Sequence, residues 1–379
     1  MIELIKFELS KIFHKKILYL LAILVAVFIV LPQMITYNQI RKDFGGKENM
    51  KTLASQFEGD KYTVSQFQNE VKTIEKKKKN NEELTKRENF IDYYMQYNYP
   101  TENEPTYLVM NKYYTHSEIK EELSKLDKNS YEYNAFEKAD EMISKLPKSQ
   151  YKYTGVWYLL LDFNVAGTMK LMLLVLGLAG IFSSEYSSNI APLLLSTKNG
   201  KRKLTMSKIL AGVIYATVVF IFVSLLYFIP SLTIGLKNGN LPLNTLEKFS
   251  STPYDITIIE YYLSTLAISF VATIIFALAI MLVSLLIKSN MISFAVSLGL
   301  YFVPALLAGL PLPEMILNII CGLSFAELIR AASIFGKFIT FNIFGNAMIY
   351  PYIAIVAMTV LLIILPIVIY KLGKRQRLC

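Results

Sequence analysis

The sequence is poor in the residues that build most metal and redox sites. Its 379 residues include two cysteines, two histidines and one tryptophan. Cys321 and Cys379 cannot form a disulfide framework, and His14 and His116 lie too far apart in sequence to suggest a metal cluster. We therefore expect no metal site in this chain.

Charged residues are also scarce, at 18%, whereas apolar residues make up 54%. An ordinary soluble domain has roughly 25% charged residues. The apolar excess is concentrated in blocks, which excludes a single globular domain and a disordered chain. The net charge of +10 lies entirely outside residues 38–157, which hold 20 basic and 20 acidic side chains. Most other basic residues flank apolar blocks, as in the cytoplasmic loops of a membrane protein, so we expect no nucleic-acid partner.

Six apolar runs are long enough to cross a lipid bilayer, because about 20 helical residues span a core of about 30 Å. They are residues 17–37, 163–183, 209–229, 262–287, 291–310 and 351–370. Basic residues precede the first run, separate the second from the third and the fourth from the fifth, and follow the last. Six crossings place all of these basic groups and both termini in the cytoplasm, including the tail at 371–379, and leave an outer loop at 230–261. If the shorter apolar stretch Met315–Ile329 also crossed the membrane, the basic tail would lie outside the cell. Residues 311–350 are therefore expected to form outer re-entrant or interfacial helices.

The first 16 residues predict a short amphipathic helix. Ile2, Ile5, Leu9 and Ile12 recur with helical spacing, and charged residues occupy the other face. Such a helix lies in the inner membrane interface, although the same residues also serve as a basic flank that sets topology. The first apolar run has no small-residue cleavage site after it, so we expect an uncleaved anchor.

The segment 38–157 is long enough for a small domain, which the charge pattern places outside the cell. Apolar spacing around residues 64–74 and 119–146, with a capping-box pair at Thr115 and Glu118, predicts a helical hairpin or small bundle without strands. Its tyrosines either pack this domain against the headgroup layer or contact a substrate or partner. They are Tyr93, Tyr94, Tyr97, Tyr99, Tyr107, Tyr113 and Tyr114.

The most informative segment, residues 184–208, joins the second and third runs. Glu185 ends the second crossing, Pro192 can start a short helix, and leucines at 193–195 give that helix an apolar face. Leucines in a polar, basic loop must be buried, either in the lipid interface or against a protein partner. The basic residues that follow are Lys201, Arg202, Lys203 and Lys208.

This segment resembles the coupling region of membrane subunits of the ABC-2 exporter family. The match is carried by Glu185, Leu193, Leu194, Leu195, Ser196-Thr197, Gly200-Lys201-Arg202-Lys203 and Lys208. The six crossings, the amphipathic N-terminus, the large outer insertion and the outer re-entrant region are also similar to that family. The resemblance implies an all-α integral membrane protein of six transmembrane helices, in which Glu185, Pro192, the three leucines, Lys201, Arg202 and Lys208 couple the permease to an ATPase.

The resemblance also implies the partners. A separate ABC ATPase subunit would bind ATP and Mg²⁺, and a second permease copy or a sister chain would complete the pathway in the lipid bilayer. The chain contains no G-x-x-x-x-G-K-[ST] loop to cradle phosphates, so we expect no catalytic residues, no cofactor and no enzymatic activity of its own.

Lys170 is the one charge well inside an apolar run, about 22 Å above Glu185 along a helix. It either lines a transport pathway, paired with Glu260 or Asp162, or extends its long stem toward the outer headgroups.

Several functions stay open. The leading expectation is an exporter permease in a bacterial plasma membrane that moves an amphipathic or hydrophobic substrate, such as a peptide, an antimicrobial or a lipid-like compound. A sodium or drug exporter of the same family is compatible. A secondary transporter or channel would need more ionisable residues in the membrane or an internal repeat. An anchored receptor would not explain five further crossings, and no motif supports a membrane enzyme.

Overall fold

The computed structural model describes residues 1–58, 64–93, 95, 105–110, 112–147, 152–161, 163–196, 201–311, 314–331 and 334–375. Within these residues, six helices are long and apolar enough to cross a membrane, as the sequence predicts for a multi-pass membrane protein. They are α2 (Lys16–Phe44), α9 (Phe163–Leu178) together with the short α8 (Trp157–Leu160), α12 (Arg202–Ile234), α13 (Ile258–Leu286), α14 (Asn290–Leu307) and α17 (Tyr350–Arg375).

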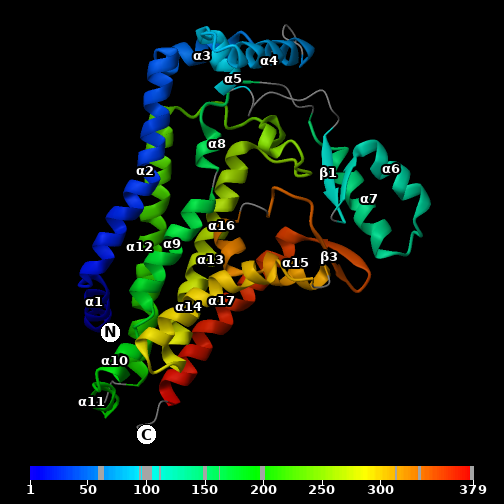
Figure 1. Cartoon of the computed structure of the whole chain (residues 1–379). Helices are drawn as coiled ribbons and strands as arrows, with labels where there is room; N and C mark the ends of the chain where they lie inside the picture. Colours follow the sequence, from blue (N-terminus) through cyan, green and yellow to red (C-terminus); the bar gives the residue numbers. More distant parts are fainter. Residues whose placement is uncertain are drawn as a thin grey trace.

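These helices form an elongated bundle with α13 at its centre (Figure 1). Helix α13 packs against α9, α12, α14 and α17, and its Ile275, Phe276 and Ile280 are completely buried. It begins at a capping box, in which the Thr257 side chain accepts from the Glu260 backbone and Glu260 bonds back to Thr257. Its apolar residues on every face are typical of a helix surrounded by other helices.

One proline in the bundle has a partner that compensates for it. Pro230 lies inside α12 and cannot donate the helical hydrogen bond to the carbonyl of Leu226. The side chain of Gln33 on α2 donates to that carbonyl over 3.3 Å, and Ser231 donates to the Gln33 oxygen over 3.0 Å. Gln33 is 4% exposed, so a buried polar side chain fastens α2 to α12.

The N-terminal residues form α1 (Ile2–Phe13), a separate helix that packs against α12. Lys15 follows it and donates to the carbonyls of Leu176 and Gly177 at the end of α9, where helical carbonyls lack partners. Ile12 is buried as expected, but Glu8 is 1% exposed. Charged residues are therefore not confined to the exposed face of α1.

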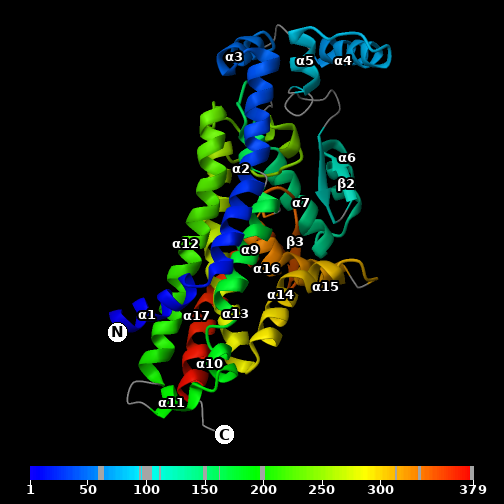
Figure 2. The ribbon, with the colours of Figure 1, turned by 60° about the vertical axis from the view of Figure 1, so that its left-hand side comes forward.

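Both described ends of the chain lie at one end of the bundle, beside α10 (Ser183–Ser187) and α11 (Ala191–Ser196), as both views show (Figures 1 and 2). We call this the terminal end. At the opposite end, α2 leads into α3 (Lys47–Ser55), α4 (Val64–Lys79) and α5 (Lys86–Tyr93). These three helices share an apolar cluster that contains Phe44, Phe57 and Phe90.

The described residues between 105 and 146 form a second packing unit, and the expectation of no strands there is wrong. β1 (Thr106–Val109) and β2 (Lys112–Thr115) pair as an antiparallel hairpin before α6 (His116–Lys125) and α7 (Tyr131–Ile143). Strands of four residues are too short for alternation to stand out in the sequence. The capping box at Thr115 and Glu118 is confirmed at the start of α6. Tyr94, Tyr97 and Tyr99 lie outside the described residues.

The 311–350 segment also contains a hairpin that the sequence reading missed. Helices α15 (Glu314–Gly322) and α16 (Phe325–Arg330) are followed by the antiparallel strands β3 (Thr340–Ile343) and β4 (Asn346–Ile349). Helix α16 packs against α9, α13 and α14, and its Leu328 and Ile329 are buried. The hairpin contacts α7, where Tyr131 donates to the Thr340 carbonyl over 3.1 Å and Asn134 to that of Gly345 over 2.9 Å. The α6–α7 unit is thus fastened to the entrance of α17.

Candidate functional site

The terminal end of the bundle contains a buried ion pair between two residues predicted to couple the chain to a partner. Lys208, in the second turn of α12, is 1% exposed, and its Nζ lies 2.7 Å from Oε1 of Glu185 on α10. The same ammonium donates to the carbonyl of Ile181, which precedes α10. A buried charged lysine is stabilised where an opposite charge and further acceptors replace its water.

Two residues of α1 complete this pair into a four-charge network. Glu8 places Oε2 at 3.4 Å from the Lys208 ammonium, and Lys11 lies 3.0 Å from Glu8 and 3.2 Å from Glu185. Two carboxylates and two ammonium groups therefore balance each other. The network connects α1, α10 and α12, which are separated by up to 200 positions in the chain.

The outermost member of the network remains charged at physiological pH. Burial alone would lower the pKa of Lys11, but the carboxylates of Glu8 and Glu185 outweigh it and raise the pKa above the usual 10.5. Lys11 thus stabilises the two acids from the accessible side. Glu8 is the functional candidate that sequence reasoning missed, although an acid three positions before Lys11 in a basic segment was a visible signal.

Helix α10 is held in place by its neighbour α13. The hydroxyl of Ser284 accepts hydrogen bonds from the backbone amides of Phe182 and Ser183, at 3.0 and 3.1 Å. These amides begin α10 and would otherwise lack partners. The segment before α11 is therefore anchored to α13 by backbone bonds as well as to α12 by the ion pair.

Helix α11 exposes apolar side chains on the surface of the molecule. It follows a turn at Asn189, whose φ is +57°, and its first residue Ala191 is buried. Leu193 is 70% exposed and Ile190 is 47% exposed, and Pro192 is exposed beside them. These three residues form what we call the α11 apolar face.

The other predicted coupling residues have different surroundings. Leu194 is half-buried, so the leucines are not equivalent, and the side chain of Leu195 lies outside the description. Lys201 and Arg202 are exposed at the start of α12, where the Thr205 hydroxyl donates to the Lys201 carbonyl over 2.6 Å. Residues 197–200 lie outside the described part of the chain.

Lys170 points into the bundle. It is 3% exposed, its Nζ donates to the Ser269 hydroxyl of α13 over 2.5 Å, and Ser269 donates to the Ile329 carbonyl of α16 over 2.5 Å. The ammonium also lies 5.2 Å from the ring centre of Phe220 on α12. These contacts hold it among four helices, an arrangement unlike an extension of its stem toward headgroups.

Of the two expected acidic partners of Lys170, the one that the structure describes is not brought to it. Glu260 is exposed and bonds to Thr257 in the α13 capping box, and Asp162 lies outside the described residues. Lys170 instead lines a narrow cavity of 20 Å³ together with Tyr227, Tyr262 and apolar side chains of α9, α12 and α13. This volume is close to that of a single water.

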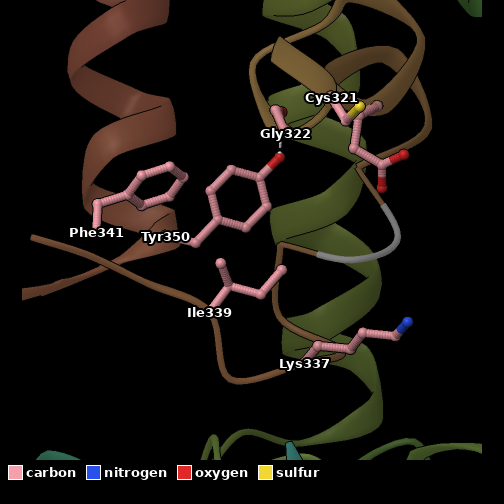
Figure 3. A pocket seen from close by; sticks show the side chains of 7 residues that line it. Cys321, Gly322, Lys337, Ile339, Phe341 and Tyr350 are labelled. Carbon is pink, nitrogen blue, oxygen red and sulfur yellow. Dashed lines mark hydrogen bonds between the residues drawn. The ribbon is translucent and has the colours of Figure 1, made fainter. Parts of the chain in front are cut away.

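A larger pocket of 190 Å³ lies between α15, the β3–β4 hairpin and α17 (Figure 3). The Tyr350 hydroxyl donates to the carbonyl of Gly322 across one side over 2.5 Å, and Phe341 lies beside its ring. Lys337 lies at the opposite side, and Glu327, which is ion-paired with Arg330 at 2.9 Å, also lines it. The pocket thus combines aromatic walls with charges of both signs.

Comparison with known proteins supplies no relative. No family model, no curated protein and no solved structure matches this chain.

Proposed function

We propose that this chain is the permease subunit of an ATP-driven exporter of the ABC-2 type. The six helices that are long and apolar enough to span a membrane support a role in transport. The observation that carries the proposal is the α11 apolar face at the terminal end, on a short segment fastened to the bundle. A solvent-facing apolar patch of this kind marks a contact with protein or membrane.

In this proposal the α11 apolar face docks on a separate ATPase. ATP and Mg²⁺ bind that partner, and closure of the partner moves α11 and α10. Because Lys208 is buried, leaving its ammonium without Glu185 would cost about 3–5 kcal/mol, so displacement of α10 carries α12 with it. Glu8 extends the same connection to α1.

The basic flanks orient the proposed permease. They put α1, α10, α11 and both termini in the cytoplasm of a bacterial cell and the α3–α7 units outside it. A second permease copy or a sister chain completes the pathway. The substrate class that fits is an amphipathic or hydrophobic compound, because the bundle has few charges and the pocket beside Tyr350 mixes aromatic and charged walls.

The test is co-purification of the full chain with a candidate ATPase in detergent. Leu193→Asp places a carboxylate on the α11 apolar face, so it should abolish ATPase retention and substrate-stimulated hydrolysis while leaving membrane insertion unchanged. The matched control is Phe344→Asp, which changes a fully exposed apolar residue in the β3–β4 turn. Equal retention by both variants would contradict the docking role of α11.

One observation favours a second candidate, a secondary transporter that works without an ATPase. Lys170 is a buried cation inside a candidate membrane span, and such residues are typical of ion and substrate pathways. Transport by the purified chain alone in vesicles with an ion gradient and no nucleotide would favour this candidate over the first.

A further inference from the structure

A basic cavity lies at the end of the bundle opposite α11. Its volume is 220 Å³, and it is enclosed by α3, the last turn of α12 and the segment around residue 153. Lys47 and Lys51 lie on α3, and Lys237 follows α12. Three lysines from two distant parts of the chain thus converge on one cavity.

Within the part of the chain that the structure describes, the positive charge of this cavity is only partly balanced by acids. Among the described residues, none of Lys47, Lys51 and Lys237 forms an ion pair, and each side chain is exposed. Glu48 is the one acid in the lining, so the cavity has a net charge of +2. An exposed group of like charges with this surplus favours binding of an anion.

The wall below the lysines is apolar. Leu232 lines the cavity and is 56% exposed, and Ile229, one turn earlier on α12, is also 56% exposed. Ile35 on the neighbouring helix α2 is 51% exposed. Both helices are candidate membrane spans, so the cavity lies where their apolar surfaces end and the basic residues begin.

The cavity is built on a rigid backbone. Val156 donates to the Gly235 carbonyl over 3.0 Å, and Lys237 donates from its backbone to Thr154 over 3.1 Å. The segments around Gly155 and Gly235 approach so closely that a Cβ at Gly155, whose φ is +73°, would lie 2.2 Å from the Gly235 oxygen. The backbone of Lys237 is therefore held against residues 154–156.

We propose that this cavity binds the phosphate-bearing headgroup of an anionic lipid. The three lysines receive the phosphate, and the exposed apolar side chains below them face the acyl chains. Clustered lysines beside a membrane attract anionic headgroups by charge, and adjoining apolar side chains accommodate the acyl chains. The inference is independent of the export function.

The experiment measures binding of short-chain phosphatidylglycerol to the purified full chain in detergent, with short-chain phosphatidylcholine and glycerol phosphate as comparison ligands. The test variant is Lys47→Gln/Lys51→Gln/Lys237→Gln. The control is Lys112→Gln/Lys120→Gln/Lys128→Gln, which removes the same charge from exposed lysines of the β2–α6 unit. Because each lysine near a headgroup contributes about a fivefold change in affinity, the test variant should bind phosphatidylglycerol at least tenfold more weakly and the control less than twofold.

The comparison ligands identify the source of the phosphate. Phosphatidylcholine should bind weakly to the wild type and to both triple variants, because its headgroup has no net charge. Leu232→Gln should weaken the binding of phosphatidylglycerol but leave the binding of glycerol phosphate unchanged. Glycerol phosphate that binds as tightly as the lipid, with the same dependence on the three lysines, would overturn the lipid assignment in favour of a soluble phosphate. Equal loss of phosphatidylglycerol binding in the test and control variants, or no loss in either, would overturn the proposal.

Discussion

Removal of the Lys208 ammonium should be among the most destabilising single changes in this protein. Lys208→Met keeps the length and apolar stem of the side chain but leaves Glu185 and Glu8 with one shared cation, Lys11, whose side chain is 40% exposed. The Glu8 side chain is 2% exposed and cannot recover its hydration. The carbonyl of Ile181 also loses a donor.

The magnitude follows from the burial of the pair. Breaking a buried ion pair by removing one partner costs about 3–5 kcal/mol, because an uncompensated charge remains in a medium of low polarity. Replacing both partners by apolar residues of similar size is often neutral or stabilising. Lys208→Met combined with Glu8→Leu should therefore recover a substantial part of the lost stability.

The assay is unfolding of the purified full chain in mild detergent, followed by helical circular dichroism. The control is Lys203→Met, an exposed lysine five positions earlier in the chain. We expect Lys208→Met to lose much of its free energy of unfolding and the double variant to recover part of that loss. The free energy of unfolding of the control should change by less than about 0.5 kcal/mol. Equal stability of the Lys208 and Lys203 variants would refute the assignment of a buried, mutually dependent network.

Three further predictions concern other residues. Lys170→Met should abolish transport with unchanged expression if the ammonium serves the pathway, whereas full transport activity would exclude that role. Gly177→Ala should lower stability by about 1–3 kcal/mol, because the new Cβ would lie 2.3 Å from the Tyr215 ring, and Gly299→Ala, with its nearest neighbour at 3.9 Å, should not. The pKa of Lys11 is raised above 10.5, so its contribution is complete below that pH and is lost as pH rises through the folded-state pKa. Lys11→Met should flatten this alkaline decline in a denaturation series and lower stability relative to wild type by the same amount at pH 7 and pH 9.

Much of the local structure was predictable from the sequence, because it depends on neighbouring residues. Apolar runs of about 20 residues form helices in a bilayer, because a helix satisfies the hydrogen bonds of its backbone within a single segment. The capping pairs at Thr115 and Thr257 depend on side chains three positions apart. The two hairpins were missed because four residues give too few alternations to distinguish a strand from a loop.

The candidate site could be predicted only in part. The sequence marked residues 185–208 by their unusual mixture of leucines and basic residues, but it could not distinguish exposed Leu193 from half-buried Leu194. That difference depends on how the turn at Asn189 directs α11 relative to the bundle.

The charge network shows most clearly what tertiary structure decided. The sequence by itself determined that Glu185 and Lys208 stand at the boundaries of apolar segments and that Glu8 lies in an amphipathic N-terminal segment. It could not determine that they meet, because they are separated by 177 and 23 positions and the pairing depends on how three helices pack. The same holds for Lys170, for which the sequence suggested acidic partners, whereas in the structure its ammonium donates to a serine hydroxyl. Local patterns specify which helices form, whereas the partner of a buried charge is specified by long-range packing that no short pattern encodes.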